Sequence, residues 1–262
     1  MRFEQLPHEP AVAAAAADLL AEVVRANPRA RVILPAGRTP APLYAELLRR
    51  ARAGALDLAR VRFFQLDEYV GVGPRDARSF HAQLRTSLLD PLALDGRAPD
   101  QDALLDGAAK DPAAEIERHA AKLARLGGAD VAFLGIGRNG HVAFNEPGTT
   151  LGLGARIVPL ASETRAVAAA AFARGKAPLR GMTLGLKELA DARRLALLAT
   201  GAAKARILSA LFDEPASTVR PASLLLDHPD FTIFADRAAA AALHDLRTAD
   251  GAGRRARSAS RA

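Results

Sequence analysis

Short apolar runs alternate with longer alanine- and leucine-rich segments along most of this 262-residue chain. Apolar runs bounded by Gly, Pro or Asp are typical of buried strands, and the longer segments have the composition and end signals of helices. Strands separated by helices form βαβ units, so we predict an α/β fold with a single doubly wound, mostly parallel sheet and helices on both faces. The predicted strands cover residues 31–34, 61–66, 131–134, 182–186, 194–200 and 231–235, and the predicted helices cover residues 10–27, 40–52, 79–90, 112–126, 163–173, 202–212 and 237–246.

The composition excludes several classes of protein. Hydrophobic residues make up 50% of the chain, which suffices for a sizeable core. The absence of cysteine excludes disulfides, thiolate metal sites and cysteine nucleophiles, and it fits a reducing compartment. No apolar run reaches the length of a transmembrane helix, and the first residues open no secretory signal. We therefore expect a cytoplasmic protein that does not bind membranes.

The basic charge of the chain is concentrated at its end. Residues 251–262 contain four arginines and no acidic residue, and removing them lowers the net charge from +7 to +3. A segment of Gly, Ala, Ser and Arg cannot bury enough apolar surface to order itself. We predict one domain over residues 1–250 and a basic, disordered tail over residues 251–262. No helix-turn-helix or aromatic-interleaved basic patch accompanies the tail, so no nucleic-acid partner is expected.

Four polar clusters follow predicted strands at their carboxyl ends. They cover residues 35–40, 67–69, 135–146 and 201–204. In a Rossmann-like open α/β sheet the carboxyl ends of parallel strands meet at one edge, and ligands bind in the crevice there. One such cluster alone would be weak evidence, because glycine after a strand is most often only a turn. Together the four clusters predict a single site for a small polar molecule.

Two of these clusters predict a phosphate site. Gly37 lets the backbone approach a ligand closely, and the amides after it lie at a predicted helix start, with Arg38 and Thr39 beside them. Thr39 is also the predicted N-cap of that helix, as Ser79 is of the next one. Lys204 adds a positive charge, although a lysine at such a place can also be a solvated surface residue. Gly137, after a third strand, is the remaining predicted ligand-binding residue.

The other clusters carry groups for proton transfer. Asp67 ends an apolar strand, where partial desolvation raises the pKa of a carboxyl toward that of a useful base. Its neighbour Glu68 is a candidate for a structural role, accepting hydrogen bonds from backbone amides. His141 lies in a glycine-rich turn with Glu146 five residues later, a spacing that suits a histidine oriented by a carboxylate.

Three segments resemble the signature segments of the glucosamine-6-phosphate deaminase family in order and spacing. They are Leu34–Pro40, Leu66–Gly71 and Gly135–Gly148, and weaker similarity runs from about residue 10 to residue 245. The sequence Asn145-Glu146-Pro147 after Gly-His is specific to the deaminases. In the related 6-phosphogluconolactonases the residues after Gly-His resemble Thr-Ala-Ser, and an Arg usually takes the place of Tyr69.

The resemblance implies a mechanism for these residues. Glucosamine 6-phosphate would bind as a ring, and His141 would assist its opening to the aldehyde. Asp67 would move a proton from C2 to C1, and water would then displace ammonia from the resulting imine to give fructose 6-phosphate. Glu146 would hold His141 in tautomer and orientation. The reaction calls for no cofactor, metal or redox step, and a small-molecule sugar phosphate is the expected partner, with homo-oligomerisation left open.

This chain departs from the family pattern at several positions. Asn139 stands where the bacterial type member has Asp, which reduces an Asp–His–Glu relay to His–Glu. The family's phosphate-binding Arg falls on Ala171 or a neighbour, so unless Arg165 or Arg174 compensates, phosphate binding would depend on residues 37–39 and Lys204. Of the basic pair that binds an allosteric activator, only Arg156 is kept, and Val158 stands at the second place.

Three functions remain open at the level of sequence. A deaminase is favoured by Asn145-Glu146-Pro147, and a 6-phosphogluconolactonase-type hydrolase is disfavoured by Tyr69. A non-catalytic sugar-phosphate sensor draws its support from the departures at Asn139 and Ala171. The identity of the amino sugar, glucosamine or galactosamine, is also left open.

Overall fold

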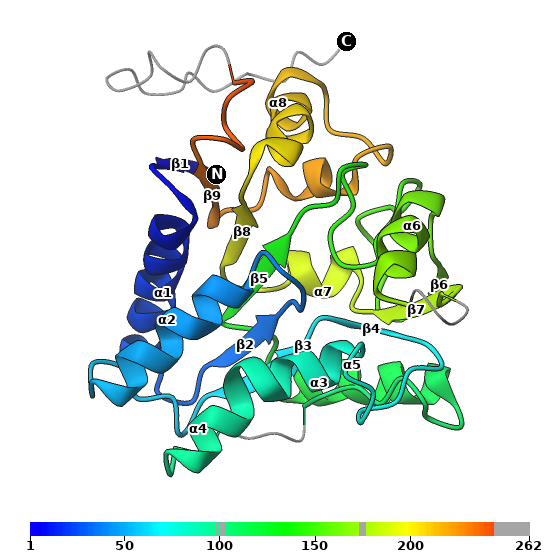
Figure 1. Ribbon diagram of the computed structural model, residues 1–262. Helices are drawn as coiled ribbons and strands as arrows, with labels where there is room; N and C mark the ends of the chain where they lie inside the picture. Colours follow the sequence, from blue (N-terminus) through cyan, green and yellow to red (C-terminus); the bar gives the residue numbers. More distant parts are fainter. Residues whose placement is uncertain (98, 100–102, 173–176, 244–262) are drawn as a thin grey trace.

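A six-stranded parallel sheet forms the centre of the molecule (Figure 1). The computed structural model describes residues 1–97, 99, 103–172 and 177–243. The strand order is β1-β9-β8-β5-β2-β3, and every registered pair in this sheet is parallel. From β2 the chain proceeds outward to β3, whereas from β5 it proceeds in the opposite direction to β8 and β9. The order therefore reverses between β2 and β5, and this switch point is where open α/β sheets bind ligands.

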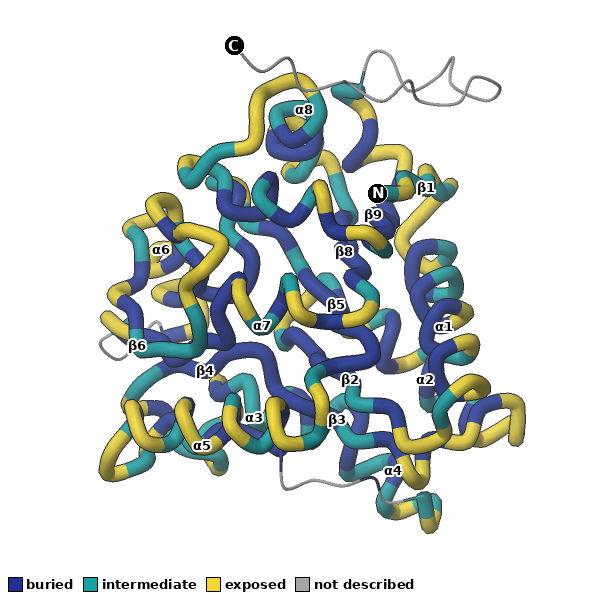
Figure 2. The backbone as a smooth tube through the Cα atoms, turned by 180° about the vertical axis from the view of Figure 1, so that it is seen from behind, coloured by how far each residue is buried: buried dark blue, intermediate teal, exposed yellow. Residues whose placement is uncertain are grey.

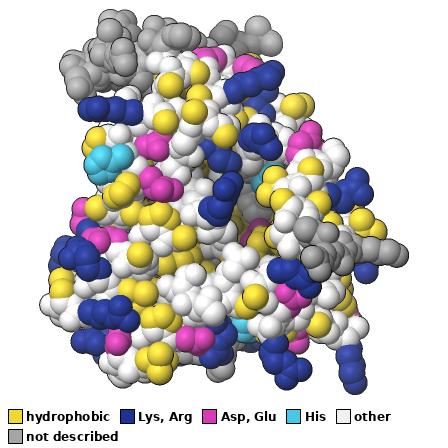
Figure 3. All heavy atoms as spheres, in the orientation of Figure 1, with side chains coloured by type: hydrophobic (Ala, Val, Ile, Leu, Met, Phe, Trp, Pro, Cys, Tyr) yellow, Lys and Arg dark blue, Asp and Glu magenta, His cyan; other side chains and the backbone are white. Residues whose placement is uncertain are grey.

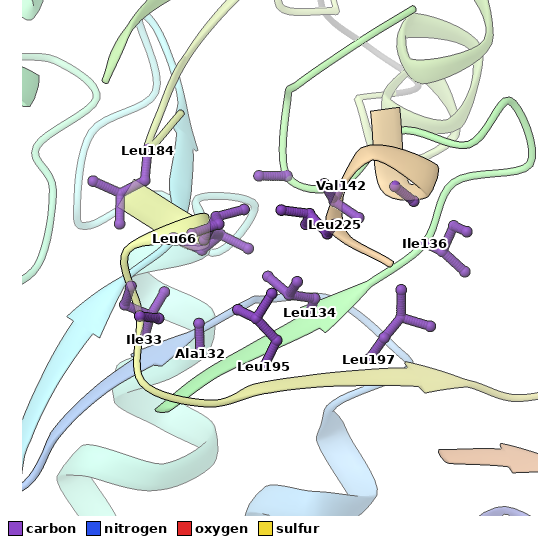
Figure 4. Packing of buried hydrophobic residues seen from close by; sticks show 14 of the residues in the cluster. Ile33, Leu66, Ala132, Leu134, Ile136, Val142, Leu184, Leu195, Leu197 and Leu225 are labelled. Atoms are coloured by element: carbon purple, nitrogen blue, oxygen red, sulfur yellow. The ribbon is translucent and has the colours of Figure 1, made fainter. Parts of the chain in front are cut away.

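Alternate residues of the central strands enter different cores, as the two-residue period of a strand requires. Ile33 and Leu134 pack on the face covered by α5, α7 and α8, whereas Val32 and Phe133 pack on the face covered by α1, α2 and α4. Figure 2 shows the buried central strands between helices whose outer sides are exposed. Figure 4 shows side chains of β2, β5 and β8 packed beneath the loops that carry Val142, Leu184 and Leu225. The doubly wound, mostly parallel sheet predicted from the sequence is confirmed.

The strands and helices have the following bounds. The central sheet contains β1 (Arg2–Leu6), β2 (Arg31–Leu34), β3 (Arg62–Gln65), β5 (Val131–Gly135), β8 (Leu195–Ala199) and β9 (Phe231–Asp236). The α-helices are α1 (Glu9–Ala26), α2 (Ala41–Arg52), α3 (Phe80–Leu84), α4 (Asp90–Leu94), α5 (Pro112–Arg125), α6 (Ser162–Ala171), α7 (Leu186–Ala190) and α8 (Ala205–Asp213). A π-helical segment, η1 (Arg85–Leu89), and two 3₁₀ segments, η2 (Ala202–Lys204) and η3 (Pro221–Leu225), complete them.

A second, three-stranded antiparallel sheet was not expected. It has the order β4-β7-β6, formed by Asp67–Tyr69, Arg180–Thr183 and Arg156–Pro159. The predicted strand at 182–186 corresponds to β7, so it belongs to this sheet and not to the central one. The segments of β4 and β6 are short, and β4 is a polar Asp-Glu-Tyr triplet that lacks the apolar run of a core strand.

Several local predictions are corrected by the structure. The helix predicted at 237–246 is a turn over the described residues 237–243, where Asp236 accepts from the backbone of Ala239. The strand β1 was not predicted from the sequence, and none of its residues is fully buried. Thr39 is not an N-cap, since α2 begins after Pro40 without a side-chain cap, whereas Ser79 caps α3 as predicted. The predicted tail at 251–262 lies outside the described residues.

Candidate active site

One cavity of about 980 Å³ lies at the carboxyl ends of the central strands. It brings together the turn after β2, the first residue of β4, the turn after β5 and the end of η2. The predicted site residues that line it are Gly37, Arg38, Thr39, Asp67, Gly137, Asn139, His141 and Lys204, while Glu146 lies behind His141. A smaller groove between α1 and α2 contains none of these residues.

The backbone of the turn after β5 is shaped to place His141 in this cavity. The amide of Gly137 donates to the carbonyl of His141 at 2.9 Å, which closes the turn. A Cβ atom at Gly137 would lie only 2.2 Å from Cε1 of the His141 ring, so the ring occupies space that only glycine leaves open. Ala143 has a φ of +53°, a left-handed conformation that is uncommon outside glycine and is often found at functional sites.

Asn139 lies between His141 and Glu146. Nδ1 of His141 is 2.6 Å from Oδ1 of Asn139 and 3.3 Å from Oε2 of Glu146, and Nδ2 of Asn139 donates to the same Glu146 oxygen at 3.1 Å. The contacts fix the neutral imidazole with its proton on Nδ1 and leave Nε2 as the acceptor. Asn139 therefore takes part directly in orienting the ring, a closer role than the reduced His–Glu pair expected from the sequence.

Glu146 is held as a carboxylate by the groups around it. Thr164 at the start of α6 donates its hydroxyl to Oε1 at 2.5 Å, and the amide of Ala161 donates to the same atom at 3.3 Å. Although burial opposes ionisation, the hydrogen bonds from His141, Thr164 and Asn139 lower the pKa of Glu146 to about 2. Glu146 is thus an ionised acceptor on the Nδ1 side of His141.

Asp67 is buried where the two sheets meet. Asp67 is only 6% exposed and is the first residue of β4. Burial, and then the neighbouring charge of Glu68, raise the pKa of Asp67 well above its usual range. A carboxylate in such a place is a stronger base than one in water, as proton abstraction from carbon requires.

Glu68 has a structural environment that contrasts with that of Asp67. It is fully buried and accepts hydrogen bonds from the amides of Tyr69, Phe80 and His81 at 2.8, 3.0 and 2.7 Å. Nε2 of Gln65 donates to it at 3.1 Å. Burial raises the pKa of Glu68 to about 7 against the lowering effect of these bonds. The residue ties the beginning of α3 to β4, which agrees with the structural alternative considered from the sequence.

The predicted phosphate end combines open backbone with positive charge. Gly37 has a φ of +105° and no atom within 4 Å of the position where a Cβ would lie. Lys204, half-buried, donates from Nζ to the carbonyl of Ile136 at 2.6 Å. Burial lowers the pKa of Lys204, and the charges of Arg138 and Arg38 lower it further. The ammonium is thus held at the cavity by a neutral carbonyl and keeps its charge available to an anion.

Several lining residues were missed in the sequence. Arg138 lies within the recognised turn, between Gly137 and Asn139, and could have been found from that position. The aromatic residues Tyr69, Phe80, Phe144 and Phe172 form one wall, with ring centroids 4.6 to 5.9 Å apart. They come from four separate segments, so no local motif marks them.

The departures noted in the sequence have structural counterparts. Ala171 lines the cavity on α6 and offers no charge, and the exposed Arg165 is not among the lining residues. Arg174 lies outside the described residues. Arg156 donates to Asn145 and the carbonyl of Gly154, both at 3.0 Å, and to Thr149 at 3.2 Å.

Two absences hold for the part of the chain that the structure describes. No group of three or more His, Asp or Glu side chains gathers there in an arrangement that could hold a metal ion. No helix among these residues is both long enough and apolar enough to cross a membrane.

The chain is similar to known sugar-phosphate enzymes over most of its length. The family model for glucosamine-6-phosphate isomerases and 6-phosphogluconolactonase matches residues 7–233. A glucosamine-6-phosphate deaminase of Bacillus velezensis is 38% identical over 226 residues, which cover 86% of this chain and 92% of the relative. One of Streptomyces coelicolor is 38% identical over 232 residues, covering 87% of each chain.

The chain also resembles solved structures of sugar-phosphate enzymes. The structure of a monomeric glucosamine-6-phosphate deaminase superposes with a TM-score of 0.86 at 30% identity, covering 92% of this chain and all of the other (100%). A 6-phosphogluconolactonase from Trypanosoma brucei superposes with a TM-score of 0.69 at 22% identity, covering 93% and 98%. At that identity the second likeness concerns the fold alone.

Proposed function

The chain belongs to the family of glucosamine-6-phosphate isomerases and 6-phosphogluconolactonases, and we propose that it converts glucosamine 6-phosphate and water to fructose 6-phosphate and ammonia. One observation carries the proposal: the cavity contains both a buried carboxyl with a raised pKa, Asp67, and a histidine held by Asn139 and Glu146. A raised-pKa base and a separate, oriented proton carrier are what an aldose–ketose isomerisation needs.

In this proposal the two groups act in sequence. Nε2 of His141 shuttles the proton that ring opening moves from the C1 hydroxyl to the ring oxygen. The carboxylate of Asp67 then takes the proton from C2 of the open-chain aldehyde, while a proton from the substrate's ammonium group ends on the aldehyde oxygen, which gives an enolamine. Asp67 returns its proton to C1, so that C1 becomes a CH2OH group and the C2–N bond becomes a protonated C=N bond. Water adds to the imine carbon, ammonia leaves with its electron pair, and the C2 carbonyl of fructose 6-phosphate remains.

The deaminase fits the site better than the two alternatives. The residues after Gly140-His141 match the deaminase pattern, and Asn145 donates to the carbonyls of Val142 and Leu184 at 3.1 and 3.0 Å, which fixes the turn. Tyr69 is buried in the aromatic wall, where a lactonase has Arg. The cytoplasmic location and the domain boundary at residue 250 stay predictions.

An ammonia-release assay tests the proposal. Purified protein is incubated with the 6-phosphates of glucosamine, galactosamine and N-acetylglucosamine, and ammonia and fructose 6-phosphate are both measured. We expect stoichiometric release of the two products from glucosamine 6-phosphate. Hydrolysis of 6-phosphogluconolactone without ammonia release would replace the proposal with the lactonase, and saturable binding without turnover of any of these would replace it with the sensor.

A further inference from the structure

Three basic side chains reach the same end of the cavity from three different strand ends. Arg38 follows β2, Arg138 follows β5 and Lys204 follows β8, and all three line the cavity. Figure 3 shows this face hollowed near its centre, with Lys or Arg side chains beside the hollow. Because these turns follow three strands of one parallel sheet at the same edge, the three charges face the same cavity.

Within the part of the chain that the structure describes, no acidic side chain neutralises this cluster. Among the described residues, neither Arg38 nor Arg138 forms an ion pair with an acidic side chain, and Lys204 bonds to a carbonyl. Elsewhere arginines are paired at short range, as in Arg50–Asp18 at 2.6 Å. Both arginines act on Lys204 by repulsion, and Arg138 has the larger effect. Unpaired like charges around a cavity are unfavourable until an anion occupies it.

Arg138, unlike Arg38, belongs to the turn that positions His141. It stands between Gly137, whose missing side chain makes room for the His141 ring, and Asn139, which holds that ring at Nδ1. A guanidinium binds a phosphate through two parallel N–H donors, whereas an ammonium acts as a point charge. An anion bound by Arg138 therefore restrains the same turn that orients His141.

We propose that Arg138 binds the substrate's phosphate together with Lys204 and thereby couples phosphate binding to the position of the catalytic turn. The inference rests on the proposed function for its substrate, but its binding part concerns any phosphate monoester. Arg138 is a positioning residue here, since it acts on the reaction through the turn that carries Asn139 and His141.

The test measures binding and turnover separately. Arg138→Gln, Arg138→Lys and the matched control Arg165→Gln, on the exposed side of α6, are compared with the unchanged protein. Binding of inorganic phosphate is measured by calorimetry, and kcat and KM are measured with glucosamine 6-phosphate. We expect Arg138→Gln to weaken phosphate binding about 10-fold to 100-fold and to raise KM and lower kcat, because it removes charge-assisted hydrogen bonds. Arg138→Lys should restore part of the phosphate affinity but little of kcat, and Arg165→Gln should change neither.

The outcomes separate this inference from the proposed function. If Arg138→Gln weakens phosphate binding while the unchanged protein releases no ammonia, the phosphate role stands and the proposed reaction fails. If Arg138→Gln binds phosphate like the unchanged protein, Arg138 is not a phosphate ligand. A loss in binding with kcat unchanged would overturn the coupling to the turn.

Discussion

The cavity has one polar wall, made of strand-end turns, and one apolar wall, made of packed aromatic residues. One wall consists of the turns after β2, β5 and β8, which carry glycines with positive φ and unpaired cations. The other consists of the small sheet, α6 and the aromatic residues between them, which form their own apolar cluster. The first wall offers directed polar groups, and the second excludes water, which strengthens every charge nearby. Asp67 lies where the walls meet, and it takes its raised pKa from that position.

Asp67→Asn should produce the largest loss, because it removes the base and keeps the shape of the junction between the walls. We expect kcat for ammonia release to fall on the order of 10²–10⁴-fold. Circular dichroism and the melting temperature of the variant serve as the control for folding. Near-normal turnover by correctly folded Asp67→Asn protein would show that the base lies elsewhere.

His141→Ala tests the polar wall, and we expect it to lower kcat on the order of 10²-fold. Glu146→Gln should lower kcat less, since Asn139 still accepts from Nδ1 at 2.6 Å. The double variant should be little worse than His141→Ala, because residues that act as a unit give non-additive losses. Fully additive losses of kcat would mean that His141 and Glu146 work independently.

Lys204→Ala removes the buried cation of the polar wall. We expect KM for glucosamine 6-phosphate to rise on the order of 10-fold, since one charge-assisted contact is lost. Unphosphorylated glucosamine should be a very poor substrate of the unchanged protein. Similar kcat/KM values for glucosamine and its 6-phosphate would remove the basis for a phosphate site at Gly37, Thr39 and Lys204.

Glu68→Gln removes a negative charge next to Asp67, at the junction between the two walls. Asp67 must be ionised to act, and its pKa is raised, so kcat/KM should fall as pH falls through that raised value. Removing the charge of Glu68 lowers the pKa of Asp67, and the acid limb of the pH profile should move to lower pH by about one unit or less. The profile is measured from pH 5 to pH 9 on protein of verified fold. A limb that stays in place or moves upward would mean that Glu68 carries no charge beside Asp67.

The smallest expected effect is that of N-acetylglucosamine 6-phosphate as an effector. Arg156 is tied to Asn145, Gly154 and Thr149, and Val158 is packed in the aromatic wall's cluster, so neither is free to bind an effector's phosphate. Initial rates across substrate concentrations should change less than about twofold on adding the compound, below the usual range of allosteric coupling. A sigmoidal curve that becomes hyperbolic would show a regulatory site on other residues.

The polar wall was largely predictable from the sequence, and the apolar wall was not. The turn after β5 carries its determinants within ten residues of chain, since Gly137, Asn139, His141 and Glu146 contact one another. The aromatic wall depends on contacts between segments far apart in the chain, such as Tyr69 with Phe172, which are more than a hundred residues apart. The small sheet likewise pairs the polar triplet of β4 with β7, and no local periodicity encodes that pairing.

The central position of Asn139 illustrates the limit within the polar wall. Its place in the chain marked it as a site residue, but its two hydrogen bonds follow from the path of the backbone between Gly137 and His141. Residue identity alone suggested that the amide of Asn139 cannot share a proton and so reduces an Asp–His–Glu relay to His141 and Glu146. In the structure the amide of Asn139 bridges the two residues. Its oxygen accepts from Nδ1 of His141, and its nitrogen donates to Glu146.

The peptide groups of Leu66, the residue directly before Asp67, join the two sheets. The Leu66 amide donates to the carbonyl of Leu34 in β2, and its carbonyl accepts from the amide of Leu184, just after β7, each at 3.0 Å. A single residue, Leu66, is thus hydrogen-bonded to both sheets. We therefore expect Asp67 to keep its place as substrate enters and product leaves, and we expect any opening of the cavity to involve α6 and the strand-end turns.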